Sequence, residues 1–93
     1  MWIKDYKGDL INTENCATIC ADNTYIAGYG DSGYYDVVKA VFIDGNVSII
    51  RRCSSQKEVG MVIRYIFEKL SRGLNTCDVF SEEIERLEDD RDA

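Results

Sequence analysis

The 93-residue chain contains no histidine. Histidine is the usual base that takes the proton from a catalytic serine, and thiol hydrolases also need a base to form their thiolate. The chain also lacks any apolar run near the roughly 20 residues that a helix needs to cross a bilayer. From these absences we expect a protein that is not an enzyme and that makes no contact with a membrane.

Targeting and metal-binding patterns are missing as well. Residues 1–7 show no basic segment followed by an apolar one, so we expect no secretion signal and a cytoplasmic location. In that reducing compartment the cysteines are expected to remain thiols. They form no C-x-x-C pair, the usual spacing of zinc ligands, so we predict no metal site and no cofactor. The four cysteines are Cys16, Cys20, Cys53 and Cys77.

Acidic residues outnumber basic ones, and most of the excess lies at the C-terminus. The net charge is −6, of which residues 81–93 carry −5 through seven acids and two arginines. An acidic chain lacks the electrostatic footprint for direct nucleic-acid binding, but it can be attracted to a basic surface of another protein. This segment is either a solubilising end or a partner-binding surface. Its candidate binding residues are Glu82, Glu83, Glu85, Glu88, Asp89 and Asp90.

The segment GYGDSGYY, residues 28–35, contains two well-known patterns. Gly28, Gly30 and Gly33 spell G-x-G-x-x-G, which binds phosphates when it follows a strand and opens a helix. Here β-branched and aromatic residues follow, so we expect a strand after a flexible turn. Residues 30–33 also read GDSG, as around the nucleophile of trypsin-like proteases, but that serine needs the missing histidine.

Residues 1–53 read as short strands separated by turn residues. The expected strands are 2–6, 10–11, 16–21, 24–29, 34–43 and 46–53, with a turn at residues 22–23. Asp44-Gly45 between β-branched runs predicts a type I′ hairpin, because both turn residues must accept positive φ. A two-residue loop there would pair residue 42 with 47, 40 with 49 and 38 with 51.

The hydrophobic period changes to that of a helix after Cys53. Ser55 and Glu58 form a capping box, and Gly73 fits the left-handed position that ends a helix. A second, short helix is expected at about residues 78–88. The apolar stripe of the main helix is predicted to be Val59, Val62, Ile63, Ile66, Phe67 and Leu70.

These elements predict an α+β fold, an antiparallel meander of about five strands packed on one C-terminal amphipathic helix. We expect a single domain over residues 1–80, followed by an acidic helix or tail over residues 81–93. Both faces of the hairpin at residues 37–53 are substantially apolar, and one helix covers one face. The other face needs the C-terminal helix, a barrel-like curl or a second copy, and we expect a homodimer.

Tyrosines gather on the strands that flank the glycine turn. They either pack the sheet or form a patch that binds a protein partner, since tyrosine is enriched in interface cores. The candidate partner-binding tyrosines are Tyr25, Tyr29, Tyr34 and Tyr35. An alternative is a nucleotide-like ligand held between aromatic rings and guanidinium groups. The candidate ligand-binding residues are Tyr34, Tyr35, Arg51 and Arg52.

Three segments, MWIKDYKGDLIN, AVFIDGNVSI and SSQKEVGMVIRYIFEKL, carry a resemblance to known proteins. Over roughly residues 1–73 the chain resembles small β-meander-plus-helix accessory proteins of Gram-positive bacteria, their phages and mobile elements. Most of these have no assigned activity, and some small acidic phage proteins inhibit host defence systems, including as anti-CRISPR proteins. The resemblance implies a stoichiometric inhibitor, in the host cytoplasm if phage-encoded. The acidic tail departs from the pattern of these proteins, and we expect specificity to lie there.

Overall fold

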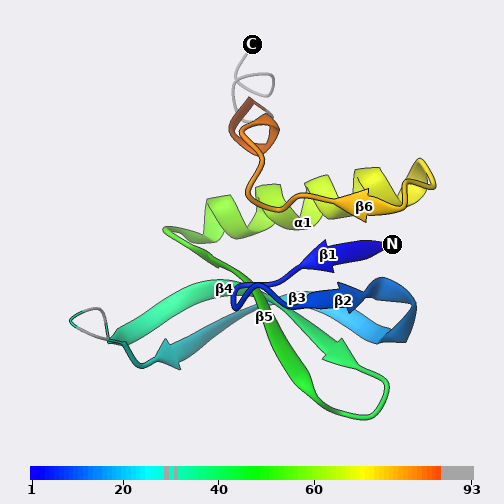
Figure 1. Ribbon diagram of the computed structural model, residues 1–93. Helices are drawn as coiled ribbons and strands as arrows, with labels where there is room; N and C mark the ends of the chain where they lie inside the picture. The colour runs from blue at the N-terminus through cyan, green and yellow to red at the C-terminus, as the bar shows by residue number, and fades with distance from the viewer. Residues whose placement is uncertain (29, 31, 87–93) are drawn as a thin grey trace.

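Residues 1–28, 30 and 32–86 are described by a computed structural model, which shows an α+β fold with two three-stranded sheets and a long helix (Figure 1). The elements in chain order are β1 (Trp2–Lys4), β2 (Leu10–Asn12), η1 (Thr13–Asn15), β3 (Cys16–Ile26), β4 (Gly33–Phe42), β5 (Val47–Cys53), α1 (Gln56–Ser71) and β6 (Thr76–Cys77). Residues 83–86 are also helical. Within the described ranges, no helix has the length and apolarity to cross a membrane.

The central sheet is an antiparallel meander in the order β3-β4-β5, so the meander has three strands and the expected five is wrong. β3 runs unbroken through residues 22–23, where we expected a turn. Asp22 and Asn23 do not turn the chain because each finds a partner across the ladder. Lys39 Nζ lies 2.9 Å from the Asp22 carboxylate, and Asn23 Nδ2 lies 3.2 Å from that of Asp36. Tertiary pairing outweighs the local turn preference.

The hairpin between β4 and β5 is real, but its turn is not type I′. Gly45 has a φ of +91° and no other residue type has positive φ in the described chain. The Gly45 N–H donates to the Phe42 carbonyl, and the Phe42 N–H donates to that of Asn46, which makes a three-residue loop. The register near the loop is therefore Val41 with Val47 and Ala40 with Ser48. A bulge at Ile50 then restores the expected pairing of residues 38 and 51.

The N-terminal sheet, in the order β2-β1-β6, joins the first strands of the chain to the segment that follows α1. β1 pairs antiparallel with β2 and parallel with β6, a short strand that the sequence did not reveal. The turn between β1 and β2 docks on β5, because the Tyr6 N–H donates to the Ile49 carbonyl at 3.0 Å. Buried Asp5 strengthens this junction. Its carboxylate accepts from the backbone N–H groups of Lys7 and Asp9 and from the Ser48 hydroxyl, at 2.7–3.0 Å.

The caps of α1 confirm the sequence prediction. Ser55 Oγ accepts the Glu58 N–H at 3.1 Å, and Gly73 has a φ of +70° in a Schellman motif. The buried stripe differs from the expected one, since Phe67 is 68% exposed and Met61 and Tyr65 are buried. The stripe is rotated because the segment after α1 returns across the helix. This segment adds Cys77, Val79 and Ile84 to the core.

Both faces of the central sheet are covered at its centre by the chain itself. Val37 and Val38 are adjacent and face opposite sides of β4, and both are fully buried. Val38 belongs to the core beneath α1. Val37 lies in register with Asp22 of β3 and Arg52 of β5. On the same face of the sheet, the Arg52 guanidinium lies over the Tyr35 ring, and Asp22 forms an ion pair with Lys39. These polar pairs thus cover the second face of the sheet. We expected a second copy because that face was predicted to be apolar and uncovered, and this reason no longer holds.

Candidate functional site

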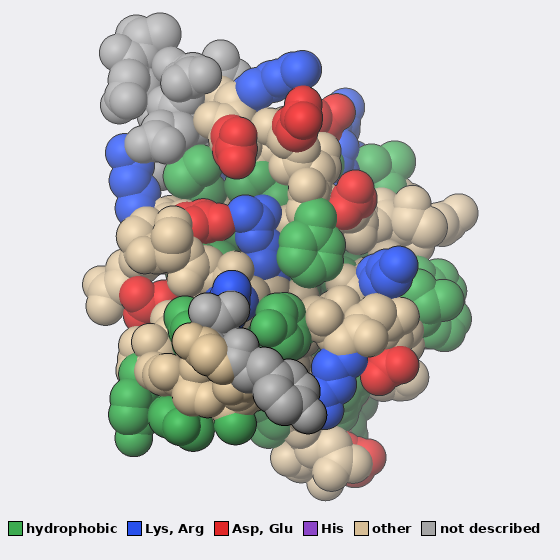
Figure 2. All heavy atoms as spheres, turned by 60° about the vertical axis from the view of Figure 1, so that its left-hand side comes forward, with side chains coloured by type: hydrophobic (Ala, Val, Ile, Leu, Met, Phe, Trp, Pro, Cys, Tyr) green, Lys and Arg blue, Asp and Glu red, His purple; other side chains and the backbone are tan. Residues whose placement is uncertain are grey.

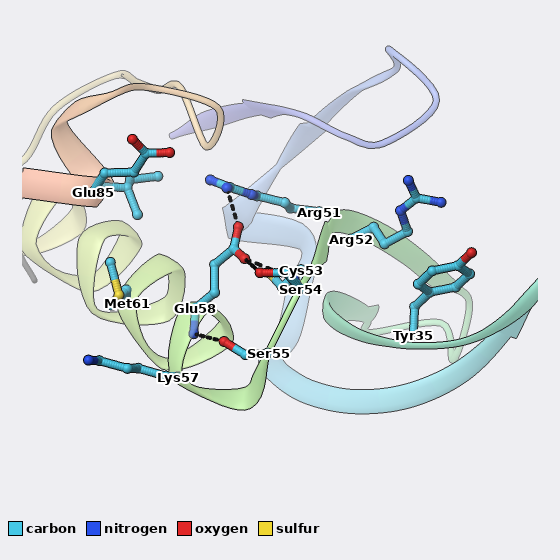
Figure 3. Close-up of a pocket in the computed structure, with 11 residues that line it drawn as sticks. Tyr35, Arg51, Arg52, Cys53, Ser54, Ser55, Lys57, Glu58, Met61 and Glu85 are labelled. Carbon is cyan, nitrogen blue, oxygen red and sulfur yellow. Dashed lines mark hydrogen bonds and ion pairs between the residues drawn. The ribbon is translucent and has the colours of Figure 1, made fainter. Parts of the chain in front are cut away.

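An open cleft of about 770 Å³ lies between the end of the central sheet and the start of α1 (Figure 3). The Arg52 guanidinium lies over the Tyr35 ring, 4.5 Å from its centroid. These are two of the four residues that we predicted for a nucleotide-like ligand. Tyr34 is not with them, because neighbouring strand residues face opposite sides. Its ring instead lies 5.5 Å from that of Tyr25 in an edge-to-face pair.

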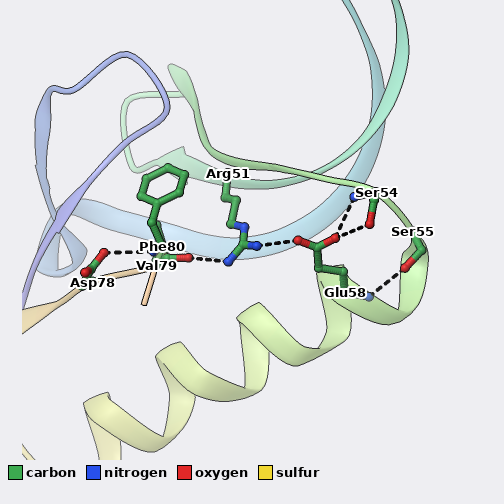
Figure 4. A network of polar contacts seen from close by, with 7 residues as sticks. All are labelled: Arg51, Ser54, Ser55, Glu58, Asp78, Val79 and Phe80. Atoms are coloured by element: carbon green, nitrogen blue, oxygen red, sulfur yellow. Dashed lines mark hydrogen bonds and ion pairs between the residues drawn. The ribbon is translucent and has the colours of Figure 1, made fainter. Parts of the chain in front are cut away.

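Arg51, the fourth predicted ligand-binding residue, is engaged in a structural network (Figure 4). Its guanidinium donates to the Val79 carbonyl at 2.6 Å and pairs with the Glu58 carboxylate. It also lies 5.8 Å from the centre of the Phe80 ring. Arg51 therefore joins β5, the first turn of α1 and the C-terminal segment, and two of its guanidinium nitrogens are committed to these contacts.

Glu58 gives the cleft an acidic wall at the start of α1. Its carboxylate accepts hydrogen bonds from the backbone N–H (2.8 Å) and the hydroxyl of Ser54, one residue before the expected capping-box partner. Burial raises the pKa of Glu58, but the bonds from Ser54 and Arg51 outweigh burial, so the pKa lies below its usual value. An ionised carboxylate at this position disfavours a phosphate at the helix N-terminus.

The charges around the cleft are mixed in sign. Glu85, Arg52 and Lys57 line the cleft as well as Glu58. Figure 2 shows acidic and basic side chains interspersed over this side of the molecule, with no large patch of either sign among the side chains it colours. A polyanion such as nucleic acid therefore finds no basic stripe here.

Cys53 lines the cleft, and like Cys16 and Cys77, which do not line it, it is suited to packing and not to nucleophilic attack. Burial raises the pKa values of Cys53 and Cys77 to about 11, so both are neutral thiols at physiological pH. Burial also raises the pKa of Cys16. The thiolate is the reactive form, so these three residues have no activated nucleophile among them.

The acidic residues near the C-terminus do not act as one group. The Glu83 carboxylate accepts from the Tyr65 hydroxyl at 3.1 Å and lies 3.5 Å from Lys69 Nζ. These bonds hold its pKa below the usual range, and they fix the segment onto α1. Glu82 and Glu85 are exposed. The predicted partner-binding residues Tyr29, Glu88, Asp89 and Asp90 lie outside the described residues.

A second hollowed surface is made of apolar side chains that the sequence analysis did not group. Two hollows share Ile11 and Phe42 as lining residues, so they adjoin each other, and we treat them as one concave surface. Exposed large apolar side chains from β1, its following turn, β2, β3 and the β4–β5 hairpin surround it. We call this the N-terminal apolar surface; its members are Trp2, Tyr6, Leu10, Tyr25, Ile43 and Val47.

The sequence carried little signal for this surface. Leu10, Ile43 and Val47 sit at strand ends and in a hairpin loop, where an apolar residue is unexpected unless it serves a contact. The apolar character of these positions was the signal in the sequence that could have indicated the surface. Of the four predicted tyrosines, Tyr25 lies on the surface and Tyr34 stacks against Tyr25.

Comparisons with protein-family models, with curated proteins and with solved structures find no match for this chain.

Proposed function

We propose that this protein is a non-enzymatic protein-binding module that docks on a partner through the N-terminal apolar surface. The observation that carries the proposal is the exposure of large aliphatic side chains around one concavity. Leu10 is 68% exposed, Ile43 74% and Val47 55%. Contiguous apolar surface of this kind marks interaction sites in monomeric proteins.

The composition of this surface suits a protein partner. Trp2, Tyr6 and Tyr25 line it together with the aliphatic residues, and aromatic residues are enriched in the cores of protein interfaces. Their indole and phenol groups supply polar atoms, while the aliphatic members supply the area that is removed from water. Together with the resemblance of residues 1–73 to accessory proteins of phages and mobile elements, this supports stoichiometric inhibition of a host protein.

The acidic C-terminal segment has a secondary role in this proposal. Exposed acids at an interface rim steer a basic partner and raise the association rate more than the affinity. Glu83 is committed to α1, so this role falls to Glu82, Glu85 and the acids of residues 87–93.

The test compares variants of the surface with a matched control on the helix. Leu10→Asp and Ile43→Asp place a charge in the proposed interface, whereas Phe67→Asp does so at an equally exposed position of α1. A partner captured from an extract of the encoding organism is purified and titrated calorimetrically. We expect at least a tenfold loss of affinity, about 1.4 kcal/mol, for the first two variants and none for the third. Equal affinities for all three variants would contradict the proposal.

The role of the acids is tested separately. Converting Glu88, Asp89 and Asp90 to their amides removes charge without touching buried Ile84, which a deletion from residue 81 would remove. We expect a slower association rate that no longer falls with added salt. An unchanged rate would leave the segment as a solubilising end.

A second candidate function is suggested by the stacked Arg52 and Tyr35 in the cleft of Figure 3. A planar, singly charged ligand could extend such a stack, whereas the wall formed by Glu58 opposes a triphosphate. Thermal unfolding with added nucleosides and nucleotides tests this reading. It requires a rise in melting temperature that Arg52→Met abolishes and Arg72→Met does not.

A further inference from the structure

The central sheet has one long open edge. β3 is the outer strand in the order β3-β4-β5, and it spans 11 residues. The opposite edge, β5, is partly closed by the bond from the Tyr6 N–H to the Ile49 carbonyl. Along residues 17–26 no backbone–backbone hydrogen bond reaches any described residue outside the ladder with β4, although the Asn23 N–H donates to the Asp22 carboxylate at 2.8 Å.

A bulge at Ala17 interrupts the start of β3, but beyond it the edge has few of the devices that usually protect a strand from pairing. It contains no proline, and its only charged side chain is Asp22. Lys39 of the neighbouring strand neutralises that carboxylate at 2.9 Å. The side chains of Ala17, Thr18 and Ala21 are short and exposed, so another strand can approach closely.

We propose that a second copy of this chain pairs with β3, antiparallel across a two-fold axis at Ala21, to form a six-stranded sheet. Two identical edges close into a dimer only when the strands run antiparallel about such an axis. Ala21 is the midpoint of β3, and this register pairs residues 18–24, which lie in the regular part of the strand beyond the bulge at Ala17. It places Thr18 opposite Thr24 of the partner, a favourable cross-strand pair.

Charge favours a second copy at this edge over other surfaces. The chain carries −6, so two copies repel each other where their acids are unpaired. The edge is locally neutral because Asp22 and Lys39 compensate each other in each copy. An axis at Asp22 would set two carboxylates directly opposite, whereas the axis at Ala21 sets each Asp22 opposite Cys20.

The first test is a disulfide at the axis. Residues directly opposite in an antiparallel pair have Cα atoms about 4.5–5.5 Å apart, within the range that a disulfide spans. In a background with Cys16→Ser and Cys20→Ser, we expect Ala21→Cys to give covalent dimers under mild oxidation. Phe67→Cys, on the exposed face of α1, serves as the control and is expected to form no covalent dimer.

The second test is the mass in solution, measured by light scattering over a range of concentrations. We expect twice the 10.6 kDa chain mass for the unchanged protein and the monomer mass for Ala21→Lys, which sets two ammonium groups opposite each other. Circular dichroism shows whether Ala21→Lys is folded; if it is not, Thr18→Lys takes its place. A monomeric unchanged protein would overturn the proposal. So would a dimer that survives both lysine variants, or one without the Ala21→Cys cross-link.

Discussion

The ion pair between Arg51 and Glu58 makes the most demanding prediction about stability. Replacing Arg51 with Met keeps the aliphatic stem but removes the donors to the Val79 carbonyl and the Glu58 carboxylate. The pair is mostly buried, with 14% and 24% of the two side chains exposed. Losing a hydrogen bond to a charged group and leaving its partner unpaired costs about 2–3 kcal/mol. In a domain of this size that corresponds to a fall in melting temperature of about 10–20 °C.

The chain offers a matched control for this prediction. Arg64 and Glu68 also pair at 3.3 Å, but on the surface of α1, where both side chains are more than 40% exposed. We expect Arg64→Met to cost about 0.5 kcal/mol or less. Urea denaturation followed by circular dichroism measures both variants. Double-mutant cycles with Glu58→Gln and Glu68→Gln isolate the two coupling energies. Equal coupling energies would refute the claim that the Arg51 network joins β5, α1 and the C-terminal segment.

Three further predictions concern ionisable groups. Because burial raises the pKa values of Cys53 and Cys77 to about 11, both should react slowly with iodoacetamide at pH 8 until urea exposes them; equal rates in both states would contradict their burial. Because the folded-state pKa of Glu58 is lowered, its ionised carboxylate stabilises the folded state near neutral pH, and this contribution is lost on acidification. Glu58→Gln should therefore lose less stability than the unchanged protein between pH 7 and pH 3 in urea titrations. Asp5→Ala should cost about 2–3 kcal/mol in the same assay, since it strands the Ser48 hydroxyl and two backbone N–H groups; a cost under about 0.5 kcal/mol would show that water replaces the carboxylate.

Local sequence signals located the main helix and its ends correctly. Ser55 caps α1 and Gly73 ends it because both positions are decided by contacts within a few residues. The strand that follows the glycine-rich segment was also predicted, since aromatic and β-branched residues follow Gly33 directly. Between β3 and β4, Ser32 Oγ bonds to both the N–H and the carbonyl of Gly28 at 2.9 Å.

Contacts between distant segments decided the features that the sequence analysis missed. β6 consists of two residues, and it is a strand only because β1 lies beside it. Phe67 belonged to the predicted apolar stripe but is exposed, and Tyr65, outside that stripe, is buried. The reason is that the chain after α1 returns across the helix. No periodicity within a helix records where a later segment will pack.

For the candidate site, too, some features followed from local sequence and others from contacts between distant segments. Tyr34 and Tyr35 were placed in one predicted ligand site, but they are adjacent on β4, so strand alternation directs them to opposite faces. The pairing of Arg52 with Tyr35 and the commitment of Arg51 to Glu58 depended on the register of β4 and β5 and on the position of α1. By itself the sequence determined the helix with its caps, the acidic balance and the absence of a histidine base, because these are local or compositional properties. Only the tertiary structure decided that Leu10, Ile43 and Val47 share one exposed concave surface, because that grouping depends on how the β1–β2 turn docks on β5.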